Sequence, residues 1–259
     1  MKQKAPQKTA AESTASPGER IAKRMARAGL CSRRDAERWI EDGRVKVNGK
    51  LLKTPACVVT DRDRIEVDGE PLPGKERSRL WLYHKKSGLV TTAKDPEGRT
   101  TVFQSLPDDL PRVLSVGRLD INTEGLLLLT NDGGLKRQME LPATGIPRTY
   151  RARAFGDVRQ EQLEALAEGV EIDGIRYGSI DANLEHGGSG KNNWIEMTIT
   201  EGKNREVRRV LEYLGLKVNR LIRTAYGPFL LGELGRGQAA RIRKGDLDRF
   251  VSSLKKGKR

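Results

Sequence analysis

The chain has few of the residues that cross-link small proteins or bind metal ions. Among its 259 residues are only two cysteines, Cys31 and Cys57, and two histidines, His84 and His186. The cysteines have no metal-site spacing and are too few for a disulfide framework, which fits a reducing cytoplasm. Together these four residues form no cluster of metal ligands in the sequence.

Long apolar runs and aromatic side chains are also scarce. Hydrophobic residues make up 36% of the chain and aromatic residues 5%, which is enough for modest cores. No apolar run approaches the roughly 18 residues that a membrane-spanning helix needs. Residues 1–19 have no apolar segment of a secretory signal, and their composition predicts a disordered tail. The sequence therefore predicts a cytoplasmic protein with no membrane partner.

Positive charge, in contrast, is abundant. The chain has 49 Lys and Arg against 35 Asp and Glu, a net charge of +14. From residue 201 onward there are 16 basic and 6 acidic residues. Neutralisation of phosphates and release of counterions reward clustered cations, so nucleic acid is the expected partner. The alternative is a basic surface that merely keeps the protein in solution.

Breaker residues divide the chain into two expected domains. Residues 20–70 contain two helices, Ile21–Ala28 and Arg33–Glu41, and short strands with a hairpin turn at Asn48-Gly49. Residues 71–79 are expected to form a linker. Residues 80–250 mix many strands with few helices, and residues 251–259 are expected to form a basic tail. This order predicts an α+β protein, in which a small two-helix-plus-sheet domain precedes a larger, mainly antiparallel mixed sheet.

Periodicity places the main elements of the larger domain. The expected strands are Leu80–Tyr83, Gly88–Thr92, Gly125–Thr130, Thr149–Phe155 and Trp194–Ile199. The expected helices are Leu135–Leu141, Arg159–Glu168 and Asn204–Leu214.

Arginines cluster on and beside the second helix of the small domain. The segment GLCSRRDAERWIEDGRVKVNGK, residues 29–50, resembles the alpha-L RNA-binding motif of the fourth small-subunit ribosomal protein. This resemblance implies that the helix face contacts RNA through its backbone and shape more than its bases. The arginines expected to bind RNA are Arg33, Arg34, Arg38 and Arg44. Pairs on a solvated helix, such as Arg33 with Glu37, would explain some of these charges instead.

The segment GRLDINTEGLLLLTNDGG, residues 117–134, places Asp120 just before an apolar run. Burial raises the pKa of such a carboxyl group, whereas a nearby guanidinium keeps the group ionised. An ionised, partly desolvated carboxylate can act as a nucleophile or base. A structural salt bridge with Arg118 is the alternative for an isolated Arg-x-Asp.

This segment resembles the signature of the RsuA/RluB-type pseudouridine synthases, and the resemblance extends over residues 80–245. It implies that Asp120 attacks the ribose of a flipped uridine, or otherwise helps to detach the base, which rejoins through carbon. The reaction would be an isomerisation that needs no cofactor and no metal. The segment PRTYRARAFG would place Tyr150 against the base, and EGKNREVRRVLEYLG would place Arg208 beside the aspartate. Without the resemblance, we would assign Tyr150 to packing in the hydrophobic core and Arg208 to phosphate binding.

Other residues take secondary roles in the same comparison. Arg118 would orient the catalytic loop or a phosphate, and Arg205 and Arg209 would bind phosphates. Leu221 and Ile222, in the segment LIRTAYGPFLLGEL, would wall the pocket.

The chain departs from the family pattern in three places. Lys86 replaces the proline of a Lys-Pro-x-Gly motif, residues 139–142 read Met-Glu-Leu-Pro where Thr-His-Pro is usual, and Arg148 replaces a lysine. The segments NTEGLLLLTNDG and NREVRR are closer to the RluB branch, which implies a 23S ribosomal RNA target. The expected partner is a stem-loop of this RNA or a ribosome assembly intermediate, and the enzyme is expected to be a monomer. The alternatives are the same reaction on 16S RNA and an RNA-binding protein that has lost catalysis. A lost activity would be marked by a replaced aspartate, and Asp120 is present.

Overall fold

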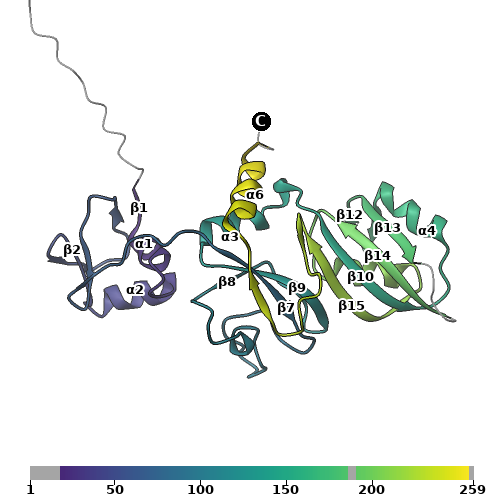
Figure 1. Ribbon diagram of the computed structural model, residues 1–259, viewed down its shortest axis with the longest axis horizontal. Coiled ribbons are helices and arrows are strands. Elements are labelled where there is room, and N and C mark those ends of the chain that lie inside the picture. The colour runs from purple at the N-terminus through teal and green to yellow at the C-terminus, as the bar shows by residue number, and fades with distance from the viewer. Residues whose placement is uncertain (1–17, 186–190, 257–259) are drawn as a thin grey trace, which may run out of the picture. The chain divides into compact units, whose positions relative to one another are not determined.

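The computed structural model describes residues 18–185 and 191–256, which form two compact units. The first unit ends at Arg77 and the second begins at Ser78, so the boundary falls within the segment expected as a linker (Figure 1). Most of the tail predicted for residues 1–19, and the last three residues of the predicted basic tail, lie outside the described residues. No helix in the described ranges has the length and apolar character of a membrane span.

The first unit combines two helices with two small antiparallel sheets (Figure 1). Its helices are α1 (Ile21–Arg27) and α2 (Arg33–Glu41). Its strands are β1 (Glu19–Arg20), β2 (Val45–Val47), β3 (Lys50–Leu51), β4 (Val58–Val59), β5 (Ile65–Val67) and β6 (Glu70–Pro71). β1 pairs with β4, and the other strands follow the order β3-β2-β5-β6. Ile21, Met25 and Ile40 are buried in its core.

Local signals fix two features of this unit. The Ser32 hydroxyl accepts a hydrogen bond from the Asp35 N–H (3.0 Å), and the Asp35 carboxylate accepts one from the Ser32 N–H (3.1 Å). This complete capping box starts α2 at the residue that the sequence predicts. Asn48 and Gly49 have φ angles of 51° and 78°, as a type I′ turn requires. Both predictions are confirmed.

The second unit is organised around one nine-stranded sheet. Its strands are β7 (Leu80–Lys85), β8 (Leu114–Val116), β9 (Thr123–Thr130), β10 (Arg148–Phe155), β13 (Ile180–Glu185), β14 (Asn192–Ile199), β15 (Lys217–Tyr226), β16 (Phe229–Leu230) and β17 (Ala239–Arg241). The main order is β13-β14-β10-β15-β9-β7-β17, with β16 beside β15 and β8 beside β9. Among the strands of the described residues, only the β9–β15 pair is parallel, so the predicted mixed, mainly antiparallel α+β architecture is confirmed.

Helices and a separate hairpin surround this sheet. The α-helices are α3 (Gly133–Glu140), α4 (Gln160–Glu164), α5 (Glu206–Tyr213) and α6 (Lys244–Lys256), and the 3-10 helices are η1 (Phe103–Ser105), η2 (Pro142–Thr144) and η3 (Ala165–Glu168). The hairpin joins β11 (Val170–Ile172) to β12 (Ile175–Tyr177). α4 lies along β13, and α3 lies beside β8 (Figure 1).

The leucine run of β9 is buried on both faces of the sheet. Leu127 and Leu129 belong to a core that also contains side chains of α4, η3 and α5. Leu126 and Leu128 belong to a second core, which includes side chains of α3 and α6. Because successive strand residues point to opposite faces, four consecutive leucines indicate a strand that is covered on both sides.

Three expectations for the larger domain need correction. Gly88–Thr92 is not a strand and contributes only a single bridge between Val90 and Thr101. The Gly88 N–H and the Thr91 hydroxyl are instead bonded to the loop around Asp120. The expected helix Arg159–Glu168 is divided between α4 and the 3-10 helix η3.

The C-terminal helix also extends beyond the expected end of the domain. Residues 251–256, assigned in advance to the basic tail, belong to α6. Val251 and Leu254 pack against the second core, which accounts for the continued helix.

Candidate active site

The loop of residues 117–122 leads into β9, and its backbone is held on both sides of Asp120. The Gly117 N–H donates to the Glu140 carboxylate (2.6 Å). Leu119 donates its N–H to the Thr91 hydroxyl (3.3 Å), and its carbonyl oxygen accepts a hydrogen bond from that hydroxyl (2.8 Å). The Asp120 carbonyl oxygen accepts from the Thr123 N–H (3.0 Å). The segment that was mistaken for a strand at Gly88–Thr92 therefore supports the loop.

A fully buried lysine lies against the same loop. Lys85 ends β7 and has no exposed surface. Its ammonium group donates to four main-chain carbonyl oxygens, those of Lys86 (3.0 Å), Asp120 (3.1 Å), Ile121 (3.3 Å) and Thr123 (2.8 Å). Burial lowers the pKa of Lys85 to about 8, although the charges of Asp120 and Glu124 oppose this shift. Sequence analysis assigned no role to this residue, although it is the lysine that precedes Lys86 in the Lys-Pro-x-Gly pattern. It is also in phase with the buried Trp81 and Tyr83 along the strand.

A cleft of about 870 Å³ opens beside this loop, entirely within the second unit. The structure brings together around it several of the predicted site residues, which are Asp120, Tyr150, Arg208, Leu221, Arg118 and Arg205. They come from the loop before β9, from β10 and β15, and from α5 and the residue before it. Arg118 and Arg205 are exposed, whereas Tyr150, Arg208 and Leu221 are buried in its wall.

The Asp120 carboxylate has no hydrogen bond or ion pair with the described residues, although the backbone of Asp120 is bonded as above. The side chain is half-buried and lines the cleft. The structural salt bridge with Arg118 that was considered as an alternative is therefore not formed within the described ranges. A carboxylate of this kind is available to a ligand in the cleft.

Arg208 connects α5 to the neighbourhood of Asp120. Its side chain is 7% exposed, and its two terminal nitrogens donate to the carbonyl oxygens of Asn122 (3.0 Å) and Val218 (3.3 Å). Burial lowers the pKa of the Arg208 guanidinium, the charge of Arg205 lowers it further, and the charge of Asp120 opposes both effects. Arg208 and Asp120 thus interact through their charges across the cleft, with no direct ion pair among the described residues.

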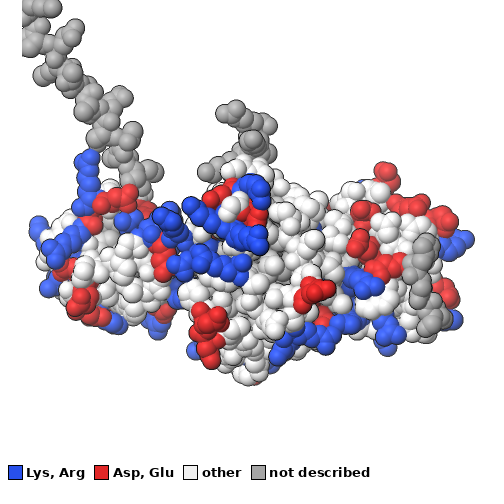
Figure 2. All heavy atoms as spheres, in the orientation of Figure 1, with Lys and Arg blue, Asp and Glu red and all other residues white. Residues whose placement is uncertain are grey.

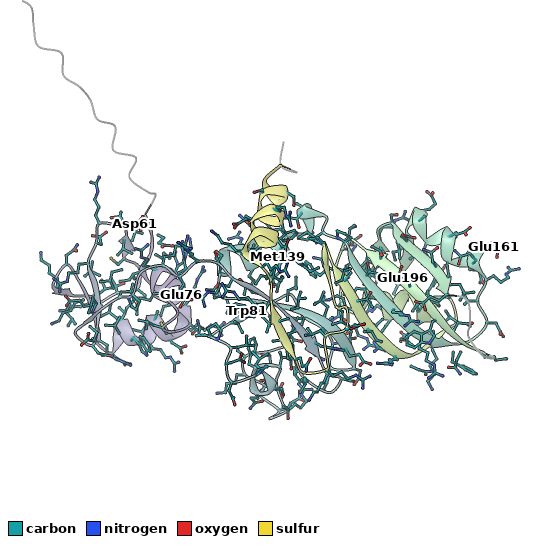
Figure 3. The ribbon with its side chains drawn as sticks, viewed as in Figure 1. Asp61, Glu76, Trp81, Met139, Glu161 and Glu196 are labelled. Atoms are coloured by element: carbon teal, nitrogen blue, oxygen red, sulfur yellow. The ribbon has the colours of Figure 1, made fainter. Side chains whose placement is uncertain are left out.

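Tyr150 is the first member of a row of aromatic rings and guanidinium groups. It pairs with Arg223 across β10 and β15, and the Arg223 guanidinium carbon lies 6.0 Å from the Tyr150 ring and 5.3 Å from the Tyr226 ring. Arg148 lies on Tyr226 (5.0 Å) and donates to its hydroxyl (3.2 Å). That hydroxyl in turn donates to the carbonyl oxygen of Met139 (2.7 Å), on α3 (Figure 3). Contacts between cations and aromatic faces stabilise such a row.

Two predicted site residues do not line the cleft. Ile222 is adjacent to Leu221 in β15, so the two side chains point to opposite faces of the sheet. Only Leu221 lies in the cleft wall, which corrects the expectation for Ile222. Arg209, half-buried on α5, is likewise absent from the lining.

The predicted RNA-binding arginines of the first unit are all exposed. Arg33 and Arg34 have no ion pair within the described residues, so the considered pair of Arg33 with Glu37 is not formed there. Arg38 pairs with Asp35. Arg44 pairs with Asp68 (2.6 Å) and lies 4.5 Å from the Trp39 ring. On the visible face of this unit, basic and acidic side chains are interspersed (Figure 2).

Another cavity, of about 1020 Å³, has walls from η2, the 227–230 turn and α6. Its lining is largely apolar and contains none of the predicted site residues. The described residues also contain no group of three or more His, Cys, Asp or Glu that could hold a metal ion. The chemistry that the predicted residues could perform therefore belongs to the cleft at Asp120.

Comparisons with known proteins agree with this geometry. Residues 79–213 match the RNA pseudouridylate synthase family, and residues 19–65 match the S4 domain. An uncharacterized RNA pseudouridine synthase of Rickettsia bellii is 49% identical over 216 residues, which cover 83% of this chain and 93% of that protein. Ribosomal large subunit pseudouridine synthase B of Pseudomonas aeruginosa is 41% identical over 237 residues, which cover 89% of this chain and 61% of that protein.

A solved structure shares the fold. A crystal structure of a pseudouridylate synthase matches with a TM-score of 0.62 at 28% identity, over 90% of this chain and 99% of the other. The family match spans both the loop of Asp120 and the helix of Arg208. The chain therefore belongs to the RNA pseudouridylate synthase family, as an RNA pseudouridine synthase, an isomerase, with an RNA-binding S4 domain.

Proposed function

We propose that this enzyme converts one uridine of 23S ribosomal RNA to pseudouridine, with Asp120 as the catalytic carboxylate. The observation that carries the proposal is the Asp120 side chain itself, which lines the cleft without a hydrogen-bond partner among the described residues while its backbone is fixed. The choice of 23S RNA is supported by relatives named ribosomal large subunit pseudouridine synthase B, at 41% identity in Pseudomonas aeruginosa and 43% in Yersinia pestis.

The proposed reaction moves a glycosidic bond from nitrogen to carbon. Asp120 attacks C1′ of the ribose, or otherwise assists, as the bond from C1′ to N1 of the base breaks. The base turns and C5 bonds to C1′, which releases the Asp120 carboxylate wherever it had bonded to C1′. The proton on C5 leaves, and N1 ends with a proton. The product is an isomer of the substrate, so the reaction consumes no cofactor. Tyr150 would stack on the base, and Arg208 would stabilise the charge of the carboxylate.

Binding must offset the cost of extruding the uridine from its stack. Extrusion costs a few kcal/mol and is easiest in a loop. Arg33 and Arg34 on the S4 domain, and Arg118 and Arg205 at the cleft, are exposed and suited to phosphate contacts. We therefore expect the substrate to be a stem-loop that presents both backbone phosphates and a loop uridine.

Release of tritium tests this function directly. Transcripts of 23S and 16S RNA, each carrying uridine tritiated at C5, are incubated with wild type and with Asp120→Asn. We expect release from the 23S transcript alone, and a rate for Asp120→Asn that is lower by more than about 1000-fold. Asp120→Asn should bind the same RNA with nearly wild-type affinity, because the substitution removes no phosphate contact.

Other outcomes would change the assignment. Release from the 16S transcript would move the target to the small subunit. No release from either RNA, with tight binding retained, would indicate an RNA binder without catalysis. Mapping of pseudouridines in cells that lack the gene would identify the nucleotide.

A further inference from the structure

Buried polar atoms without partners gather at the wall of the cleft. Among the described residues, three such atoms belong to side chains that line it: the Thr123 hydroxyl, the Arg208 Nε and the Arg223 Nη2. Thr123 and Arg223 are each 2% exposed. The one other unpartnered buried atom in the described ranges is His84 Nε2. Unpaired buried polar groups are costly, and folded proteins retain them chiefly where function requires them.

The parallel pair of β9 and β15 brings Thr123 and Arg223 to the same site. Thr123 lies opposite Leu221, and Gly125 lies opposite Arg223. A Cβ atom at position 125 would lie 2.4 Å from the Arg223 carbonyl oxygen, and the φ angle of Gly125 is +104°. Only glycine therefore permits this close approach. The Arg223 Nε donates to the Leu126 carbonyl oxygen (2.7 Å), which fixes the base of the guanidinium and leaves Nη2 unused.

These two side chains match one edge of uracil. That edge presents the O4 acceptor, the N3–H donor and the O2 acceptor in a row. A threonine hydroxyl can accept from N3–H, and a guanidinium N–H can donate to a carbonyl oxygen. Cytosine instead presents an acceptor at N3 and an amino donor at N4. The Thr123 hydroxyl could turn to donate to N3, but the Arg223 guanidinium would meet the amino group, and stay unpaired, whenever the C4 side of the base faces it. A site built on such hydrogen bonds rejects the wrong base strongly.

The same edge is suited to a reaction in which the base turns over. A half-turn about the axis through N3 and C6 exchanges N1 with C5 and exchanges O2 with O4. N3–H keeps its position, and each carbonyl oxygen is replaced by the other. A pair of groups that binds N3–H and one carbonyl oxygen therefore binds the base equally well before and after it turns.

We propose that Thr123 and Arg223 form a polar floor in the cleft that hydrogen-bonds the O4–N3–O2 edge of the flipped uracil. This floor selects uridine over cytidine and holds the base through its rotation. The proposal rests on the proposed function, because it assumes that a uridine is isomerised at Asp120. Arg223 is also next to Tyr150, so the floor and the stacking ring are parts of one wall.

A double-mutant cycle, which combines substitution of Thr123 with methylation of N3 of the base, tests whether the two groups are hydrogen-bonded. Thr123→Val removes the hydroxyl at nearly constant volume, and Thr123→Ser retains it as the matched control. The substrates are 23S RNA stem-loops with uridine or 3-methyluridine at the mapped position, assayed in single turnover by chromatography of nucleosides. We expect Thr123→Val to slow conversion of uridine about 10- to 100-fold and Thr123→Ser less than about threefold. N3 methylation should slow conversion by wild type strongly. In Thr123→Val it should slow conversion by less than about a further threefold, because the hydrogen bond is already lost.

A parallel series tests the arginine. Arg223→Met should reduce the rate at saturating RNA about 10- to 100-fold, with RNA affinity within about threefold of wild type, and Arg223→Lys should restore part of the loss. Replacing one base oxygen by sulfur, in 2-thiouridine or 4-thiouridine, should slow wild type and not Arg223→Met. Arg220→Met is the matched control, because Arg220 is in the same strand but pairs with Glu124 (2.5 Å) outside the cleft.

The results distinguish a failure of the polar floor from a failure of the proposed function. If wild type converts uridine, but the effects of Thr123→Val and N3 methylation multiply in full, the floor is overturned and the proposed function stands. Equal losses in Arg223→Met and Arg220→Met would also overturn the role of Arg223. If wild type converts no uridine in any ribosomal RNA, the proposed function fails and the floor fails with it.

Discussion

The arginines of the S4 helix and the buried cations of the second unit have opposite surroundings. In the S4 domain, Arg33 and Arg34 are exposed and unpaired within the described residues, where phosphates can reach them. At the cleft, Lys85, Arg208 and Arg223 are at most 7% exposed, and each donates to main-chain carbonyl oxygens. Exposed cations attract RNA in a salt-dependent manner, whereas these buried cations hold the backbone of the Asp120 loop and the strand that follows it. Burial, rather than residue type, decides which function a cation has.

Among the cations, the largest effect should follow from loss of the buried lysine. Lys85→Met removes a donor shared by four carbonyl oxygens of the Asp120 loop and its surroundings. We expect the free energy of unfolding to fall by about 2–4 kcal/mol and turnover by more than about 100-fold, because the loop loses its fixed geometry. Urea denaturation and tritium release measure the two effects. Unchanged turnover in a folded Lys85→Met protein would contradict the role given to the buried cations.

The pH dependence of stability and turnover tests the same role of Lys85, with a somewhat smaller expected effect. Lys85 has a pKa of about 8, below its ordinary value of 10.5, so it loses its proton in the folded state before it would in the unfolded state. Between these values the unfolded chain binds more protons, and the contribution of Lys85 to stability rises with pH. Activity should move the other way, falling roughly tenfold between about pH 7 and 9, because the neutral amine has fewer N–H donors. Stability and turnover of Lys85→Met should lack both trends.

Loss of exposed cations should change binding and its response to salt. Arg34→Ala with Arg38→Ala should weaken RNA binding roughly fivefold and reduce the slope of log affinity against log salt by up to about 2. The single-turnover rate at saturating RNA should change much less. Fluorescence anisotropy at several salt concentrations measures the slope.

Arg99→Ala provides the control for charge alone. Arg99 is exposed, belongs to the second unit and pairs with Asp95 (2.9 Å) and Glu97 (2.8 Å). Its removal should leave the salt slope within error of wild type. Equal slopes for the double variant and wild type would contradict an RNA-binding role for the S4 arginines.

The smallest effect should come from the helix that carries these arginines. Ser32→Ala removes one side of the capping box of α2 and should lower the stability of the S4 domain by about 1 kcal/mol. Turnover at saturating RNA should not change, because Ser32 is not among the residues that line the cleft. Thermal unfolding followed by circular dichroism measures the loss. Restoration by Ser32→Thr or Ser32→Asp would show that the cap, rather than another contact, was removed.

Sequence patterns predicted the elements whose signals are local. The bounds of α2, the turn at Asn48-Gly49 and the buried strand at Leu126–Leu129 follow from capping, turn chemistry and strand periodicity. The prediction failed at Gly88–Thr92, which has the composition of a strand but bonds to the loop of Asp120 through Gly88 and Thr91. Such bonds join segments about 30 residues apart, and no short window of sequence contains them.

The sequence by itself determined the α+β class, the cationic S4 helix and the motif that contains Asp120, since each depends on residues that are near one another in the chain. Only the tertiary structure decided which side chains share the cleft. Pairing of β9 with β15 separated Leu221 from Ile222 and brought Arg223 to the wall, while burial placed Lys85 under the loop. These residues were missed because burial and strand pairing, not residue type, give a lysine or arginine its role.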